Sequence, residues 1–345
     1  MTLYRLPAEW ENQSGIQLTW PNQNNEWGNS IDQAEKCLSQ IAKEISYREK
    51  LLIVCEDKKR VISLMVKAEA DLNNIVFVEL NNNDIWARDH AAITVYETKS
   101  GKPKLLDFSF NGWGLKYVAN FDNQISRNLY KKRIFKNASF ETINLVLEGG
   151  SIEANGKGII LTTSQCLLSP NRNPSLSKSA LEEQFSQYFG TQKVLWLDYG
   201  YMSGDDTDSH IDTLARFYNE NGIVYMSSDK PTDEHYEELK LMEEQLKTFT
   251  NLQGQSFELK PLFLPKPVLD QQNNRMPATY ANFLIINKAV LMPIYGDPEK
   301  DEMAFNTLQT CFPERQIITI DCRALILQYG SLHCATMQYP YGINW

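Results

Sequence analysis

Long apolar runs are absent from this 345-residue sequence. No stretch approaches the roughly 18 consecutive apolar residues that a membrane-spanning helix requires. The first residues, Met1 to Pro7, contain no apolar run of signal-peptide length. These absences argue against a membrane protein and against an exported one, and we expect the protein in the cytoplasm.

Basic clusters are also absent. The chain has 34 Lys and Arg against 43 Asp and Glu, for a net charge of −9. Because nucleic-acid binding depends on Lys and Arg that neutralise phosphates, this balance argues against a nucleic-acid partner. An acidic chain favours small, positively charged ligands instead. The oligomeric state is left open, a homo-oligomer included.

Paired metal or disulfide motifs are missing too. The six cysteines are scattered without a Cys-x-x-Cys pair: Cys37, Cys55, Cys166, Cys311, Cys322 and Cys334. We expect reduced thiols, five of them structural, Cys166 included, and one chemical. His210-x-Asp212 is half of a metal motif, but none of the other three histidines has metal-site spacing. The sequence therefore predicts neither a metal nor another cofactor.

No Pro- or Gly-rich linker and no low-complexity segment divides the chain, so we predict a single domain over residues 1–345, although length alone would suggest two. One pattern repeats along it. A polar residue precedes an apolar strand, a turn, a second strand, usually a helix, and another strand. Asn155-Gly156 and Asn221-Gly222 are typical hairpin turns within this pattern.

The repeat predicts an α/β fold of ββαβ units with a period of about 60–80 residues. The leading polar residues are Asp89, Glu148, His210 and Asn282. Units that each present a polar residue at one structural point favour a radial arrangement, with those residues converging on an axis. The alternative is an open sheet of unrelated hairpins. The long irregular stretch 266–279 is a candidate lid.

Two carboxylates fit a planar cation. A guanidinium group donates paired hydrogen bonds to carboxylates, so Asp89 and Asp212 are candidates to hold its two edges. Trp86 lies close to Asp89 in the sequence and is a candidate to cover the face of the cation. The alternative for either Asp is an ordinary turn or cap residue.

An acid–base pair and a thiol complete the set. His210 and Asp212 share a face if they lie in a strand, and Glu148, at the end of an apolar strand, is a candidate to orient the imidazole. Cys334 follows His333. If that segment is extended, the two side chains point to opposite faces, and His210 is the better base for Cys334. A tight turn there would overturn this inference.

Five motifs together carry a resemblance. They are Trp86-Ala87-Arg88-Asp89-His90, Leu147-Glu148-Gly149-Gly150-Ser151, Cys166-Leu167-Leu168-Ser169-Pro170-Asn171-Arg172-Asn173-Pro174, Gly204-Asp205-Asp206-Thr207-Asp208-Ser209-His210-Ile211-Asp212 and Tyr295-Gly296-Asp297-Pro298. The chain resembles the agmatine deiminase and bacterial peptidylarginine deiminase-like family over nearly its whole length. That family belongs to the guanidine-modifying enzymes, which form a five-bladed α/β propeller, the pentein fold.

The resemblance implies roles for individual residues. Cys334 would be the nucleophile, His210 the general acid and base, and Glu148 its partner. Asp89 and Asp212 would bind the guanidinium. The chain departs from the family beside the nucleophile, where Gln328-Tyr329-Gly330-Ser331 stands in place of a Gly-Gly-Gly-Asn run. This change bears on substrate specificity more than on the chemistry.

The implied function is agmatine deimination in putrescine and polyamine biosynthesis, through a covalent thiouronium on Cys334, with N-carbamoylputrescine and ammonia as products. Asp206, four residues before His210, resembles a position that is acidic in agmatine deiminases, and would meet the distal ammonium. The alternatives are a peptidylarginine deiminase, a deiminase of another guanidino compound, a non-catalytic guanidine or polyamine binder and, last, a metal-dependent hydrolase.

Overall fold

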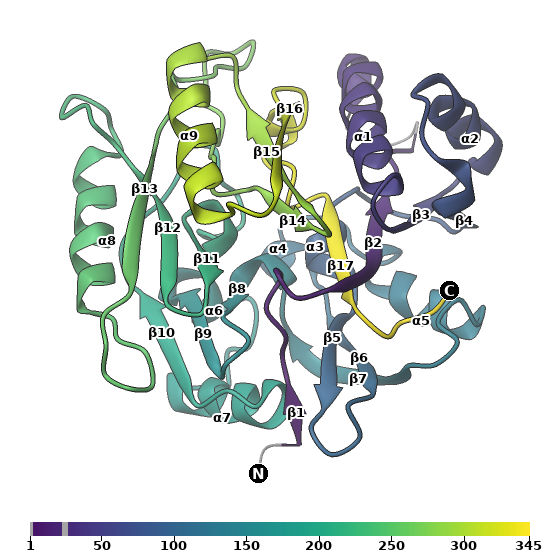
Figure 1. The fold of residues 1–345 in the computed structure, drawn as a ribbon, viewed down its shortest axis with the longest axis horizontal. Helices are drawn as coiled ribbons and strands as arrows, with labels where there is room; N and C mark the ends of the chain where they lie inside the picture. Colours follow the sequence, from purple (N-terminus) through teal and green to yellow (C-terminus); the bar gives the residue numbers. More distant parts are fainter. Residues whose placement is uncertain (1–2, 23–26) are drawn as a thin grey trace.

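The computed structural model describes residues 3–22 and 27–345, and its strands form five small sheets (Figure 1). Four of the sheets are built from consecutive segments of the chain. In each, two antiparallel strands are followed by a helical connection and a third strand that runs parallel to the second. The predicted ββαβ units are therefore confirmed.

The four consecutive units have the following bounds. The first contains β5 (Ile93–Glu97), β6 (Pro103–Ser109), α4 (Gly112–Leu115), α5 (Ile125–Lys131) and β7 (Ser139–Val146). The second contains β8 (Ile152–Ala154), β9 (Ile159–Thr163), α6 (Ser164–Leu167), α7 (Lys178–Phe189) and β10 (Lys193–Leu197). The third contains β11 (Ala215–Asn219), β12 (Gly222–Ser227), α8 (Tyr236–Thr248) and β13 (Glu258–Phe263). The fourth contains β14 (Leu284–Ile286), β15 (Ala289–Ile294), α9 (Pro298–Cys311) and β16 (Gln316–Asp321).

The fifth sheet joins the two ends of the chain. The last strand, β17 (Thr336–Pro340), pairs antiparallel with β2 (Gln13–Thr19), and β2 runs parallel to β3 (Lys50–Cys55) after α1 (Ile31–Ser46). After α2 (Lys58–Lys67) the chain forms β4 (Ile75–Glu79), which pairs parallel with β3 at the edge of this sheet. The short β1 (Tyr4–Arg5) belongs to the first sheet, where it pairs with β5. The N- and C-terminal segments thus complete a fifth unit of the same kind, a closure that the sequence pattern did not predict.

Local chemistry explains these elements. In α1 the buried Ala34, Leu38, Ile41 and Ile45 recur at helical spacing. The β8–β9 turn is closed by Asn155, whose Oδ1 accepts the backbone N–H groups of Lys157 at 2.9 Å and Ile159 at 3.1 Å. Among the described residues, no helix combines the length and apolar character needed to cross a bilayer.

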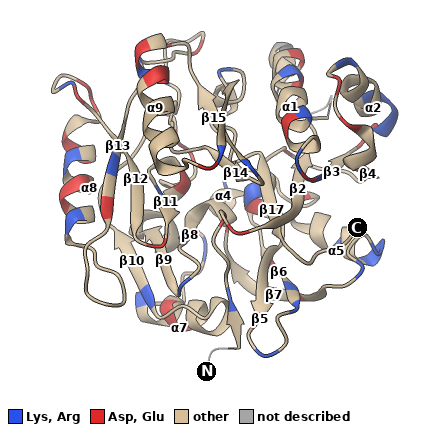
Figure 2. Ribbon diagram, viewed as in Figure 1, with Lys and Arg blue, Asp and Glu red and all other residues tan. Residues whose placement is uncertain are grey.

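The long helices and the short ones occupy different places. In Figure 1, α1, α2, α7, α8 and α9 lie at the periphery, whereas the one-turn helices α3 (Ala87–His90) and α4 lie near the centre. Acidic and basic residues lie side by side on the outer helices α1 and α8 (Figure 2). The functional candidates are carried by the central elements, which include two 3-10 turns at Gly149–Ser151 and Ile211–Thr213.

Candidate active site

A cavity with a volume of about 170 Å³ opens at the centre of the fold. Its described lining consists of Trp27, Asn83, Asp84, Trp86, Asp89, Trp113, Tyr117, Val118, Asp206, Thr207, Gln328, Tyr329, Gly330 and Cys334. Four predicted site residues are among them. The stretch 266–279 contributes none, so its role as a lid stays a prediction. Arg275 of that stretch is instead bonded to Asp233 and Glu234, just before α8.

Asp89 sits in the one-turn helix α3, 4% exposed. Its Oδ1 accepts the backbone N–H of Gly150 and its Oδ2 accepts the indole N–H of Trp113, each at 2.9 Å. Burial, reinforced by the negative charge of Asp212, raises the pKa of Asp89 to about 6. A fixed, buried carboxylate of this kind gains from a cationic ligand.

Asp212 is fully buried on the 3-10 turn Ile211–Thr213. Its Oδ2 accepts from Nδ1 of His333 at 2.7 Å and lies 3.8 Å from Sγ of Cys334. Burial raises the pKa of Asp212, but the bond to His333 and the positive charges of His333, His210 and Arg216 together outweigh burial, and the pKa lies below its ordinary value. Within the described chain its other oxygen, Oδ1, has no hydrogen-bond partner. A buried carboxylate oxygen without a donor is an open position for a ligand N–H.

Gly150 marks the point where three of these groups meet. A Cβ at this position would lie 2.6 Å from Nδ1 of His210, 2.9 Å from Oδ1 of Asp89 and 3.2 Å from Oδ2 of Asp212. A Cβ at Gly149 would lie 2.2 Å from the carbonyl oxygen of Arg88. The two glycines thus allow the backbone to approach these groups closely, because a glycine has no Cβ to clash with them.

His210 is fully buried, with Nδ1 3.7 Å from Oδ1 of Asp89. In the described part of the chain neither ring nitrogen has a hydrogen bond of good geometry. Burial lowers the pKa of His210, but the charge of Asp89, with smaller contributions from Cys166 and Glu148, raises it well above its usual value. The surrounding negative charge therefore favours the imidazolium form of the ring.

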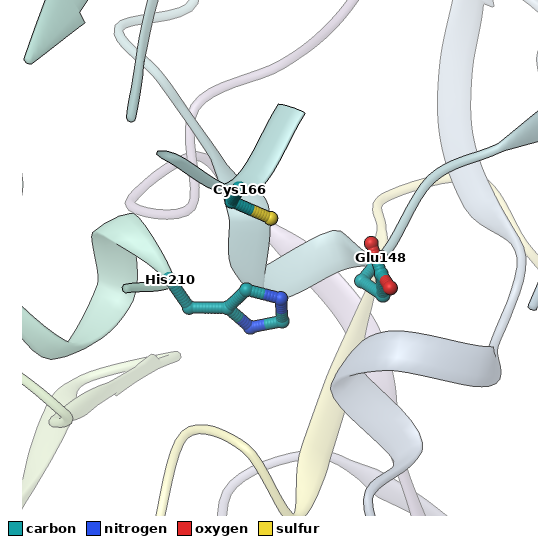
Figure 3. A group of neighbouring side chains, drawn as sticks. All are labelled: Glu148, Cys166 and His210. Atoms are coloured by element: carbon teal, nitrogen blue, oxygen red, sulfur yellow. The ribbon is translucent and has the colours of Figure 1, made fainter. Parts of the chain in front are cut away.

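Glu148 lies beside His210 but is hydrogen-bonded to Arg172. Both of its oxygens accept from Nε of Arg172 at 3.0 Å, with both side chains fully buried, and no hydrogen bond joins Glu148 to His210. The carboxylate still lies close to the ring: Glu148, Cys166 and His210 place their polar atoms within 4.8 Å of one another (Figure 3). The role of Glu148 as the partner that orients His210 therefore stays a prediction: Arg172 takes the direct hydrogen bonds of its oxygens, while the charge of Glu148 contributes to the raised pKa of His210.

From the sequence, Arg172 has no role of its own and is only one residue of the motif that runs from Cys166 to Pro174. Besides Glu148, it donates from Nη1 to Oδ2 of Asp208 at 2.6 Å and from Nη2 to the carbonyl of Thr207 at 2.9 Å. It therefore ties the strand end at Glu148 to the segment that leads into His210.

The segment around Cys334 is a turn, not an extended strand. The N–H of Ala335 donates to the carbonyl of Ser331 at 3.2 Å, and that of Thr336 to His333 at 3.0 Å. The extended-segment inference therefore fails. Even so, the ring of His333 is bonded to Asp212 and, through Nε2, to Glu9 at 2.8 Å, and neither ring nitrogen is bonded to the thiol.

Asn282 anchors this turn. Its Oδ1 accepts the backbone N–H groups of His333 at 2.9 Å and Cys334 at 3.2 Å, and its side-chain N–H donates to Sγ of Cys334 at 3.2 Å. Asn282 led the fourth repeat in the sequence pattern, which was the signal for it. Burial and the charges of Asp212 and Asp89 raise the pKa of the Cys334 thiol well above its ordinary value.

The outer wall of the cavity is acidic. Oδ2 of Asp206 accepts the hydroxyl of Tyr117 at 2.7 Å. Burial raises the pKa of Asp206 to about 6 and that of Asp84, to which the charge of Asp206 also contributes, to about 7. Asp84 was missed at the sequence level, because nothing separates it from its Asn-rich neighbours.

The group of Glu148, Cys166 and His210 also has donor types that bind zinc. A metal there would compete with the guanidinium of Arg172, which already neutralises Glu148. This arrangement fits a charge network better than a metal centre.

Comparison with known families agrees with this geometry. Residues 5–340 match the family described as Porphyromonas-type peptidyl-arginine deiminase. The chain belongs to this family. Its relatives include a putative agmatine deiminase from Mycoplasma capricolum, 32% identical over 97% of this chain and 95% of the relative, and one from Vibrio parahaemolyticus, 33% identical over 98% and 97%.

Solved structures of the family have the same fold. A putative arginine deiminase from Porphyromonas gingivalis is 44% identical, with a TM-score of 0.93 over 99% of this chain and 100% of the other. A substrate-bound variant of C. jejuni agmatine deiminase is 35% identical, with a TM-score of 0.90 over 99% and 97%. The mixed α/β fold is therefore the one on which agmatine deiminases are built.

Proposed function

We propose that this chain hydrolyses the guanidinium group of agmatine to give N-carbamoylputrescine and ammonia. The observation that carries the proposal is the pair of buried carboxylates, Asp89 and Asp212, beside the thiol of Cys334 at one cavity. The described cavity lining contains no Lys or Arg. A site with this charge favours a cation, and its described lining has no positively charged side chain to pair with a carboxylate.

The guanidinium binds between the two carboxylates. Oδ1 of Asp212 is without a donor, and each oxygen of Asp89 has a second lone pair beyond the bond it already accepts. Bidentate pairing fixes the plane of the guanidinium. Trp86, a lining residue that is 4% exposed, forms part of the cavity wall beside the bound cation.

The reaction uses Cys334 as nucleophile and His210 as acid and then base. The thiolate attacks the guanidinium carbon and forms a C–S bond. His210 donates its proton to the departing nitrogen, the C–N bond breaks, and ammonia leaves a covalent thiouronium. Water then adds to the carbon as His210 takes up one of its protons, the C–S bond breaks, and the urea product loses its remaining extra proton to solvent.

The charges at the site suit this order of events. Burial and the negative charges of Asp212 and Asp89 raise the pKa of the Cys334 thiol. A bound guanidinium offsets those charges and so favours the thiolate when substrate is present. The raised pKa of His210 favours the acid form that the first step needs.

The far end of agmatine is an ammonium group, and we propose that Asp206, with Asp84, receives it. Both line the cavity, and both have raised pKa values that a neighbouring cation would lower. A cavity of about 170 Å³ is smaller than the typical few hundred Å³ of drug-sized ligand sites, which suits a short linear molecule with a guanidinium at one end and an ammonium at the other.

Peptidylarginine deimination is the second candidate. It is favoured by the name of the matched family and by a solved structure titled a putative peptidyl-arginine deiminase, which is 41% identical to this chain. Against it stands the acidic outer wall, since a peptide presents no ammonium there.

We further propose that the five sheets are blades of one propeller. Asp89, Glu148, His210, Asn282 and Cys334 each come from the start of a different ββαβ unit, and their contacts converge on one region. A radial arrangement accounts for this convergence more simply than an open sheet does.

The test is ammonia release from agmatine, free arginine, a peptidyl-arginine and arcaine, assayed side by side with and without excess chelator. We expect agmatine to be used best, with no effect of chelator. Equal use of agmatine and the peptide would contradict the proposed substrate. Binding of agmatine without ammonia release would favour a non-catalytic guanidine binder.

A further inference from the structure

We propose that Cys166, expected from the sequence to be merely structural, is a positioning residue for His210. Its thiol lies on the inner side of the imidazole, within 4.8 Å of a ring nitrogen, and would hold the ring so that the opposite nitrogen faces the substrate. This inference rests on the proposed role of His210 in the reaction. It begins from a placement in space: Glu148, Cys166 and His210 come from three different segments and meet within 4.8 Å.

The two ring nitrogens of His210 have different surroundings. Nδ1 lies toward the reaction site, 3.7 Å from Oδ1 of Asp89 and beside Gly150. Figure 3 shows one ring nitrogen directed to the space between the sulfur of Cys166 and the carboxylate of Glu148. Both oxygens of Glu148 already accept from Arg172. The thiol is therefore the uncommitted group on the inner side of the ring.

The position of Cys166 is rigidly built. The residue is fully buried in the one-turn helix α6, where its N–H donates to Oγ1 of Thr163 at 3.3 Å. The hydroxyl of Thr163 in turn donates to the carbonyl of Ser209, the residue before His210, at 2.8 Å. The same cap thus fixes the thiol and the backbone that carries the imidazole.

A thiol suits a group that changes protonation state twice in a turnover. Its sulfur accepts weakly from an imidazolium N–H, and its S–H donates weakly to a neutral ring nitrogen. Burial raises the pKa of Cys166, so the group stays a neutral thiol through both steps. A carboxylate at the same place would instead trap the proton on the ring.

The charged and titratable groups that face His210 are Asp89 on α3, Asp212 on its own turn, Glu148 with its partner Arg172, and Cys166 on α6. Of these groups, only Cys166 can be replaced by a neutral residue without changing the net charge around His210. Because its sulfur favours the protonated ring, Cys166→Ala should lower the pKa of His210. The alkaline limb of kcat, which reports loss of the acid form, should then move to lower pH.

The test compares Cys166→Ala and Cys166→Ser with Cys55→Ala in the full chain. Cys55 is a buried cysteine of β3 that does not line the cavity, so it controls for loss of a buried sulfur. We expect kcat for agmatine to fall about tenfold in Cys166→Ala and its alkaline limb to move by about half a pH unit or more. Cys166→Ser, which can donate and accept, should lie between this variant and wild type.

A second readout separates this inference from the proposed function. The chain has only four histidines, so the His210 ring can be titrated by nitrogen NMR without substrate. A lowered His210 pKa in Cys166→Ala supports the contact even if no guanidine is hydrolysed. The inference would be overturned if Cys166→Ala left the His210 pKa and the pH profile of kcat unchanged, as in Cys55→Ala. It would also be overturned if Cys166→Ser behaved like wild type and Cys166→Ala lost only stability.

Discussion

Replacing Gly150 by Ala is a direct test of the convergence described above. The new methyl carbon would lie 2.6 Å from Nδ1 of His210 and 2.9 Å from Oδ1 of Asp89. Neither group can yield easily, because His210 is fully buried and Asp89 is fixed by two hydrogen bonds. The backbone of Gly150 does not have the positive φ that would strain an alanine, so the effect is steric.

The magnitude follows from the packing. Overfilling a dense site costs about 1–3 kcal/mol of folding free energy, which a chain of this size tolerates. A displacement of about 1 Å in an acid–base group costs roughly a hundredfold in rate. We therefore expect Gly150→Ala to fold, with a modestly lower Tm, and to lose about two orders of magnitude in kcat/KM for agmatine.

Gly101→Ala is the matched control. Gly101 has φ +67° in the β5–β6 turn, with no atom within 4 Å of an added Cβ. Alanine there costs about 1 kcal/mol through backbone strain alone and touches nothing in the site. Unfolding by urea and steady-state ammonia release would be measured for both variants. A folded Gly150→Ala enzyme with activity within about threefold of Gly101→Ala would refute the proposed convergence.

Three further predictions concern the residues of the cavity. Cys334→Ser should abolish turnover and leave the unfolding midpoint nearly unchanged, since the two side chains are nearly isosteric; substantial activity would exclude Cys334 as the nucleophile. Asp206→Asn should weaken agmatine use by about 1.5–3 kcal/mol, the worth of a hydrogen bond to a charged group, and improve arginine relative to agmatine; equal losses for both substrates would argue against a distal contact. Because acids lose their charge below their pKa, KM for agmatine should rise as pH falls through about 7, the value for Asp84, and then about 6, the value for both Asp89 and Asp206; Asp206→Asn should remove its share of the lower part of this rise and leave that of Asp89.

The repeated fold could be predicted because its signals are local. Hairpin turns such as Asn155-Gly156 and the helical spacing of Ile41 and Ile45 depend on residues a few positions apart. The closure of the fifth sheet by β17 and β2 could not be predicted in this way. Its two strands lie at opposite ends of the chain and carry no mark of their partner, so only the packed chain brings them together.

The site divides along the same line. The types of residue at Asp89, Asp212 and Cys334 are enough to indicate a cation and a nucleophile, because each side chain's chemistry is its own. Contacts between side chains that are far apart in the chain cannot be read from the sequence. Arg172 takes the oxygens of Glu148, the thiol of Cys166 lies within 4.8 Å of a ring nitrogen of His210, and the turn at Cys334 is held by Asn282. Each of these contacts joins separate segments, and each changes what a single residue can do.

The central claim is a covalent intermediate on Cys334. Wild-type enzyme quenched during turnover of agmatine should be analysed by intact mass and peptide mapping, with Cys334→Ser treated in parallel. The account predicts an adduct of the mass of agmatine less ammonia, confined to the peptide that contains Cys334 and absent from the variant. Turnover with no adduct at any quench time, or an adduct on Cys166 instead, would contradict it.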